Sequence, residues 1–106
     1  MPLLSAVVPC FNEEDSLPLF LSELDKVCKK MRDEWPDLSF EAVLVDDGSS
    51  DGTLTIMRNA VSNAEYGFHV RWISFSRNFG KEAALYAGVR HSHGDYGATL
   101  DADSAV

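Results

Sequence analysis

The chain is poor in basic residues, with nine Lys and Arg against seventeen Asp and Glu and a formal net charge of −8. A nucleic-acid-binding surface presents clustered Lys and Arg, so this composition excludes nucleic acid as the expected partner. The negative field also repels anionic ligands, and a diphosphate would need a cation or a helix N-terminus to hold it.

Cysteine and long apolar runs are scarce as well. Cys10 and Cys28 have no metal-ligand spacing, which favours reduced thiols and a cytoplasmic setting over a disulfide. No run approaches the roughly 18 apolar residues of a membrane span, and no positively charged signal leader is present. We therefore expect one soluble domain over residues 1–106.

Apolar strands alternate with amphipathic helices along the sequence. Strands are predicted at 3–8, 40–45, 69–75 and 96–100, and helices at 14–32, 53–64 and 81–91. This alternation predicts right-handed crossovers and a mostly parallel open α/β sheet. We expect the strand order 3-2-1-4, with Pro9 closing the first strand and Asp51 capping the second helix.

Acids and turn formers follow three of these strands. The first leads into Phe11-Asn12-Glu13, the second into Asp46-Asp47, and the last into Asp101-Ala102-Asp103. Ligands of open parallel sheets bind at the carboxyl ends of the strands. The sequence therefore predicts a single crevice lined by these three segments.

Each segment has a functional and a structural interpretation. Asp101 and Asp103 can hold a hard divalent cation or a sugar hydroxyl if the chain bends at Ala102, or they form a solvated turn. Asp46 or Asp47 can accept a hydrogen bond from a base, or both belong to a turn that precedes a helix cap.

The remaining candidates are open in the same way. Phe11 can form the wall of a ligand pocket, whereas Asn12 and Glu13 can simply begin a helix. Arg77 and Lys81 flank the start of the third helix, where they meet a diphosphate or remain ordinary surface charges.

Four sequence blocks together resemble inverting glycosyltransferases of family 2. They are Val8-Pro9-Cys10-Phe11-Asn12-Glu13-Glu14, Val45-Asp46-Asp47-Gly48-Ser49-Ser50-Asp51-Gly52-Thr53, Ser76-Arg77-Asn78-Phe79-Gly80-Lys81-Glu82-Ala83-Ala84 and Asp101-Ala102-Asp103. The third block is similar to the branch that transfers a sugar from a nucleotide donor to dolichyl or undecaprenyl phosphate. The implied fold is the nucleotide-binding half of the Rossmann-like GT-A fold.

The resemblance also implies roles for individual residues. Pro9, Phe11 and Glu13, with Asn12 in the same block, would line the base and ribose pocket. Val45 and Asp47 would contact the base, so replacing Asp47 should weaken nucleotide binding without unfolding the domain.

The same resemblance implies the metal and phosphate ligands. The catalytic residues Asp101 and Asp103 would hold Mg²⁺ or Mn²⁺ on the donor diphosphate, with Asp101 also near the ribose and sugar. Lys81 would be a phosphate neighbour.

The implied reaction transfers a hexose from a UDP- or GDP-sugar to a polyprenyl phosphate, at the cytoplasmic face of a membrane in intact relatives. That branch usually continues after its Asp-x-Asp with Leu, Gln and a Pro-rich turn, whereas Ser104-Ala105-Val106 follow here. We therefore expect the chain to supply the donor-binding half, to lack transfer activity alone and to self-associate through its last strand. The alternative is a non-catalytic nucleotide-binding or interaction domain.

Overall fold

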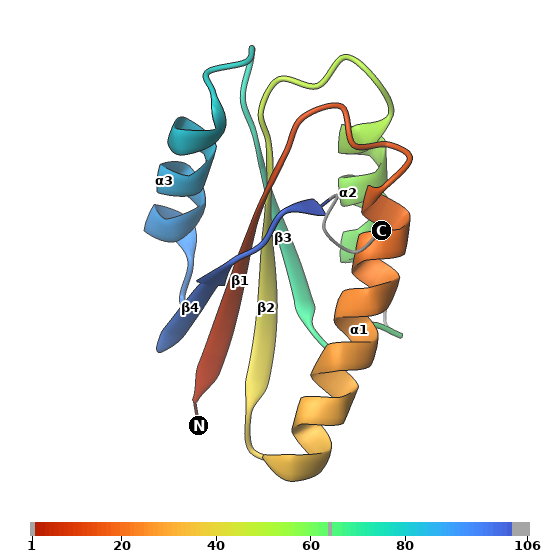
Figure 1. The fold of residues 1–106 in the computed structure, drawn as a ribbon, viewed down its shortest axis with the longest axis vertical. Coiled ribbons are helices and arrows are strands. Elements are labelled where there is room, and N and C mark those ends of the chain that lie inside the picture. The colour runs from red at the N-terminus through yellow and green to blue at the C-terminus, as the bar shows by residue number, and fades with distance from the viewer. Residues whose placement is uncertain (1, 64, 103–106) are drawn as a thin grey trace.

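The computed structural model describes residues 2–63 and 65–102. Its elements are β1 (Leu3–Cys10), α1 (Leu17–Glu34), β2 (Ser39–Asp46), α2 (Thr53–Val61), β3 (His69–Ser74), α3 (Lys81–His91) and β4 (Tyr96–Thr99). The described strands form a parallel sheet in the order β3-β2-β1-β4, which confirms the predicted topology. Helices α1 and α2 cover one face of the sheet and α3 covers the other (Figure 1).

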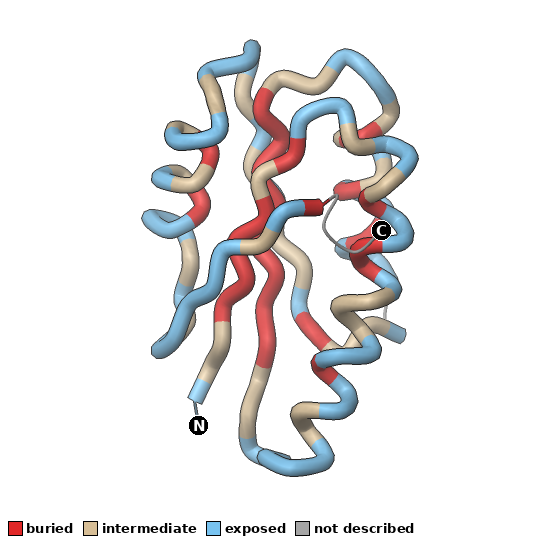
Figure 2. The backbone as a smooth tube through the Cα atoms, viewed as in Figure 1, coloured by how far each residue is buried: buried red, intermediate tan, exposed pale blue. Residues whose placement is uncertain are grey.

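The core consists of two layers, one on each face of the sheet. The larger layer packs Val8 and Leu44 against Leu17, Leu21 and Met57 of the two covering helices. The smaller layer, beneath α3, contains Val7, Val43, Val45 and Ala84. Strands β1 and β2 are therefore buried on both faces (Figure 2), which explains why their sequences are nearly continuous apolar runs.

The predicted helix boundaries shift at three ends, while α3 has the predicted bounds. Helix α1 begins at Leu17 rather than at residue 14, because residues 14–16 form a turn ahead of Pro18 in the first helical turn. It ends at Glu34, where Trp35 N–H donates to Met31 C=O at 2.9 Å. Helix α2 ends at Val61, and its predicted last residue, Ala64, lies outside the described residues.

The N-cap of α2 is Gly52, one position later than the predicted cap, Asp51. Gly52 directly precedes the helix, but the Asp51 carboxylate accepts a hydrogen bond from Thr53 N–H at 3.0 Å. An aspartate that bonds the backbone two residues on forms a local turn. Asp51 therefore stabilises the first turn of α2 as predicted, from outside the helix.

Pro9 does not close β1, because the strand continues through it to Cys10, with Pro9 opposite Val45 of β2. Val7 C=O accepts the Leu100 N–H at 2.9 Å, so Val7 faces β4, and Pro9, two residues on, faces the same side. The pairing of β1 with β4 ends at Val7 and Thr99. A central strand tolerates this proline because its missing N–H falls where the neighbouring strand has ended.

The bounds of the other three strands also differ from the prediction. Strand β2 is longer than predicted at both ends, and β3 and β4 end one residue earlier, at Ser74 and Thr99.

Within residues 2–63 and 65–102, no helix combines the length and apolar character needed to cross a bilayer.

Both cysteine thiols are free and buried, and we expect them to resist modification. Burial raises the pKa of Cys28 to about 11, against a partial lowering by Arg32. Burial and the carboxylates of Glu13 and Asp46 also raise the pKa of Cys10. At neutral pH the thiolate fraction of Cys28 should be about 100-fold below that of a free thiol, because each pKa unit is a factor of ten.

A thiol-reactive dye tests this expectation against the urea-unfolded chain as control. We expect slow labelling of the folded chain and stability that falls between pH 9 and 11, because the unfolded thiols ionise first. Equal labelling rates for the folded and unfolded chains would contradict the burial.

Candidate functional site

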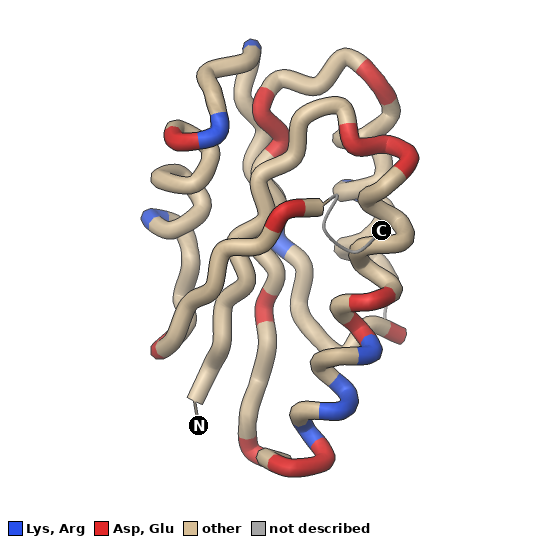
Figure 3. The backbone as a smooth tube through the Cα atoms, viewed as in Figure 1, with Lys and Arg blue, Asp and Glu red and all other residues tan. Residues whose placement is uncertain are grey.

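A cleft of about 440 Å³ opens at the carboxyl ends of β1 and β2, where β4 leaves the sheet and α3 begins. It is lined by Pro9, Cys10, Phe11, Glu13, Asp47, Asn78, Gly80, Lys81, Asp101 and Ala102. Six of these residues are predicted site residues: Pro9, Phe11, Glu13, Asp47, Lys81 and Asp101. Figure 3 shows acidic positions gathered at this end of the sheet.

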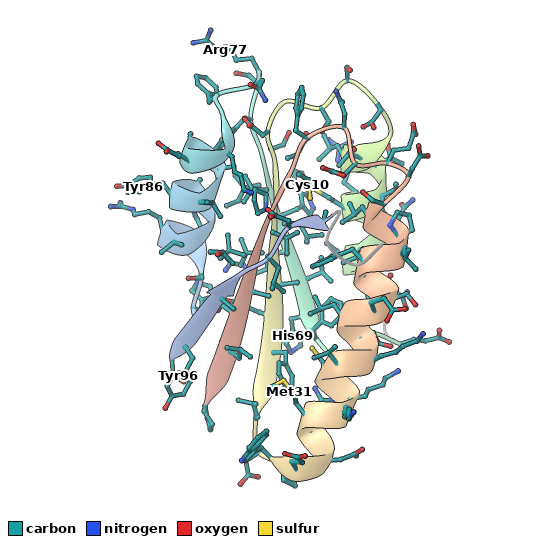
Figure 4. The ribbon with its side chains drawn as sticks, in the orientation of Figure 1. Cys10, Met31, His69, Arg77, Tyr86 and Tyr96 are labelled. Carbon is teal, nitrogen blue, oxygen red and sulfur yellow. The ribbon has the colours of Figure 1, made fainter. Side chains whose placement is uncertain are left out.

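The cleft is not the largest hollow of the described chain. A hollow of about 670 Å³ lies at the opposite end of the sheet, beside Met31, Trp35 and Tyr96. Figure 4 shows Met31 and Tyr96 there, far from Arg77 at the other end. Ligand sites are marked by convergent polar groups more than by size, so the smaller cleft is the better candidate.

Asp47 joins the cleft to the N-terminus of α3. Its side chain accepts hydrogen bonds from Phe79 N–H at 2.8 Å, Gly80 N–H at 3.0 Å and the Asn78 amide at 3.1 Å. The residue is only 3% exposed. The expectation that Asp47 affects binding alone is therefore incomplete, because this carboxylate also holds the loop that precedes α3.

The carboxylate of Asp47 keeps some capacity for a ligand. Oδ1 accepts from Phe79, whereas Oδ2 accepts from both Asn78 and Gly80. Each carboxylate oxygen has about two acceptor positions, so Oδ1 retains one. A negative charge at this helix end is also stabilised by the helix dipole.

Phe11 and Glu13 form the β1 side of the cleft. Phe11 is 45% exposed, which leaves part of its ring available to a planar ligand. Glu13 is half-buried, with its carboxylate accepting from Ser16 Oγ at 2.6 Å and its N–H donating to Thr53 Oγ1 at 2.9 Å. Both contacts fix the loop between β1 and α1.

Asp101 and Lys81 face each other across the cleft. Lys81 Nζ lies 2.6 Å from Asp101 Oδ1, and both side chains are about half-exposed. An exposed ion pair of this kind contributes little to stability. Ala102 is 2% exposed and packs on the core, whereas Asp103, the other predicted metal ligand, lies outside the described residues.

Two predicted site residues do not line the cleft. The side chain of Val45 is fully buried in the layer beneath α3, so the expected contact between Val45 and a base would have to come from its backbone and stays a prediction. Asn12 has a positive φ of 52° and binds the loop after β2, accepting from Ser50 N–H and donating to Ser49 Oγ, each at 2.9 Å. Asn12 therefore joins two loops instead of facing the cleft.

Sequence reasoning missed four lining residues: Cys10, Asn78, Gly80 and Ala102. Asn78 and Gly80 belong to the segment 76–84, in which the sequence indicated only the cations Arg77 and Lys81 as possible phosphate contacts. Arg77 itself is exposed, with its guanidinium 4.5 Å from the ring centre of Phe79. A glycine directly before a predicted helix was the available signal, because glycine allows a backbone with positive φ, and Gly80 has a φ of +103°.

The donor chemistry of the cleft suits a hard cation. Within the described ranges, no three His, Cys, Asp or Glu side chains gather closely enough to form a metal site. Carboxylate oxygens are nevertheless the ligands that Mg²⁺ and Mn²⁺ prefer, and Asp101 presents one in the cleft. A cation there would compete with Lys81 for this oxygen.

Solved structures with the same arrangement define the fold class as GT-A, that of nucleotide-sugar glycosyltransferases. The mannosyltransferase PcManGT from Pyrobaculum calidifontis, solved with GDP-Man and Mn²⁺, aligns with a TM-score of 0.70 and 30% identity over 96% of this chain and 28% of its own. S. aureus TarS 1–349 in complex with UDP aligns at 0.72 with 24% identity, over 94% of this chain and 27% of its own.

The chain belongs to glycosyl transferase family 2, whose model matches residues 5–106. An undecaprenyl-phosphate 4-deoxy-4-formamido-L-arabinose transferase from Photorhabdus laumondii is 41% identical over 93% of this chain. The chain spans 28% of the length of that relative. The family predicted from the sequence blocks is therefore confirmed.

Proposed function

We propose that this chain binds the nucleotide-sugar donor of an inverting glycosyltransferase that acts on a polyprenyl phosphate. The observation that carries the proposal is the meeting of Phe11, Asp47 and Asp101 in one cleft at the strand ends. The proposal follows the general rule for open α/β sheets, whose ligands bind where the strand order reverses, here between β1 and β4.

In this proposal the base and ribose lie against Phe11, Pro9 and Glu13. The exposed ring of Phe11 provides a stacking surface, and the remaining acceptor position on Asp47 Oδ1 receives an N–H of the base. The nucleotides in the solved relatives differ, UDP in one and GDP-Man in the other. Both bases carry a ring N–H that a carboxylate can accept.

Asp101, together with Asp103, would hold Mg²⁺ or Mn²⁺ against the donor diphosphate. A bound cation supplies charge that stabilises the leaving diphosphate, which the acidic cleft cannot do alone. Lys81 would release Asp101 and meet the phosphates. The Mn²⁺ in the PcManGT complex supports the use of a divalent cation.

The acceptor and sugar are inferred from the relatives. Undecaprenyl phosphate appears in the name of the Photorhabdus protein, which supports a polyprenyl phosphate acceptor. The cytoplasmic face of a membrane stays a prediction. A deprotonated lipid phosphate is already a nucleophile and needs little help from a general base. The same name specifies a modified arabinose, which is a pentose, so the proposed sugar is a nucleotide-linked pentose or hexose. Self-association through β4 stays a prediction.

Calorimetric titration of the chain with UDP and GDP tests the proposal. We expect affinity in Mn²⁺ to exceed that in chelator by at least about tenfold, because a cation must offset the repulsion between the diphosphate and the acidic cleft. Asp101→Asn should remove most of this metal dependence. Asp37→Asn, at the larger hollow, is the matched control and should bind like the unmodified chain.

Two outcomes would contradict the proposal. Equal affinity with and without the cation would exclude the metal role of Asp101. The absence of heat with either nucleotide would favour the non-catalytic interaction domain instead.

A further inference from the structure

A buried carboxylate lies far from the cleft, in the middle of β2. Glu41 is 4% exposed, on a strand whose other acid, Asp46, lies at the carboxyl end. Its Oε2 accepts from Ser5 Oγ at 2.5 Å and from His93 N–H at 2.6 Å. Its Oε1 lies 3.5 Å from Arg71 Nη1. Burial alone would raise the pKa of Glu41, but the bonds from Ser5 and His93 and the charge of Arg71 lower it.

These contacts fix the segment that connects α3 to β4. Ser5 Oγ also accepts from Gly94 N–H at 2.8 Å, and Arg71 donates to His91 C=O. A Cβ on Gly94 would lie 2.3 Å from Ser5 Oγ, so the backbone passes this point in close contact with β1. One carboxylate thus joins three strands and the connection from α3 to β4.

The residues of β4 do little to specify the register in which this strand pairs with β1. It has four residues, Tyr96 to Thr99, and all four are exposed. A strand register is normally fixed by a buried apolar face, and a slip of one residue turns every side chain to the other face. The register of β4 must therefore be fixed from outside the strand.

We propose that Glu41 is a positioning residue that sets the register of β4 and thereby places Asp101 in the cleft. The role of Asp101 in this inference rests on the proposed function, whereas the effect on the register does not. The path of contacts is continuous. Glu41 and Ser5 hold residues 93 and 94, Asp95 N–H then donates to Leu3 C=O at 2.7 Å, and β4 pairs from Leu4 opposite Tyr96 to Val7 opposite Thr99. The last contact is the hydrogen bond that Leu100 N–H donates to Val7 C=O.

Amide hydrogen exchange tests the register directly, at residues distant from Glu41. In Glu41→Leu we expect the Leu100 amide to exchange at least tenfold faster, while Phe75 N–H, which donates to Asp46 C=O at the opposite edge, changes less. Glu41→Gln keeps an acceptor for Ser5 and His93 and should restore the Leu100 protection. If Glu41→Leu does not fold, Ser5→Ala gives the same comparison with a smaller perturbation.

A destabilising variant in the other layer provides the control. Met57 belongs to α2 and is buried in the layer on the other face of the sheet, so Met57→Val should accelerate both amides by the same factor. Equal acceleration of Leu100 and Phe75 in Glu41→Leu and Ser5→Ala would overturn the inference, because Glu41 would then be merely structural. Nucleotide affinity should fall together with Leu100 protection. If the unmodified chain binds no nucleotide, the proposed function fails while the exchange data still decide the register.

Discussion

Asp47→Ala should lower the free energy of unfolding by about 3 kcal/mol, because hydrogen bonds to a charged acceptor contribute about 1.5–3 kcal/mol each and buried donors left unpaired add a further cost. The variant removes the acceptor of Phe79 N–H, Gly80 N–H and the Asn78 amide together. Urea denaturation measures the change. Nucleotide binding should be lost as well, because Lys81 follows directly after the released loop.

Two variants make the Asp47 result specific. Asp47→Asn keeps one carbonyl acceptor and should lose roughly half as much stability. Asp51→Ala removes an exposed carboxylate that caps the first turn of α2 and should cost about 1 kcal/mol. A loss in Asp47→Ala no larger than in Asp51→Ala would show that the loop before α3 does not depend on Asp47.

Gly48→Ala should be at least as damaging, with an expected loss of roughly 3 kcal/mol or more from strain and a backbone clash. Gly48 has a φ of +76°, and a Cβ there would lie 2.3 Å from the carbonyl carbon of Arg77 and 2.4 Å from Asn78 N. No side-chain rotation can relieve a clash between a Cβ and a backbone, so the loops at residues 48 and 77 must separate. Thermal denaturation measures the loss.

Gly80→Ala separates the two causes of this loss. Gly80 also has a positive φ, +103°, but a Cβ there would meet no atom within 4 Å. This variant should therefore cost only the backbone strain of about 1–3 kcal/mol. If both glycine variants lose the same stability, the close approach of the two loops contributes nothing.

The elements and their order could be predicted because their signals are local. Helix α3 has its predicted bounds, and the alternation of strands and helices gave the order of the sheet. Acids at strand ends predicted which segments meet, since parallel strands end at one edge. Short-range patterns therefore located the site.

The partners of individual side chains could not be predicted, because they come from distant parts of the chain. Asp47 is held by residues more than thirty positions later, and Asn12 by the loop after β2. The burial of Val45 beneath α3 could not be predicted, because a strand buried on both faces gives no alternation to show which side chain faces α3. The role of Glu41, within an apolar strand, could not be predicted, since its partners Ser5 and His93 are brought to it by the tertiary structure.

Pro9 marks the point along β1 beyond which the strand pairs with β2 alone and no longer with β4. In the register of β1 and β4, the next bond after Leu100 N–H to Val7 would have the N–H of residue 9 donate to Leu100 C=O, and proline has no N–H. The ladder therefore stops at a chemically fixed point, so Asp101 leaves the sheet instead of becoming another paired strand residue. Any other residue at position 9 would restore the donor that the ladder needs to continue past Val7.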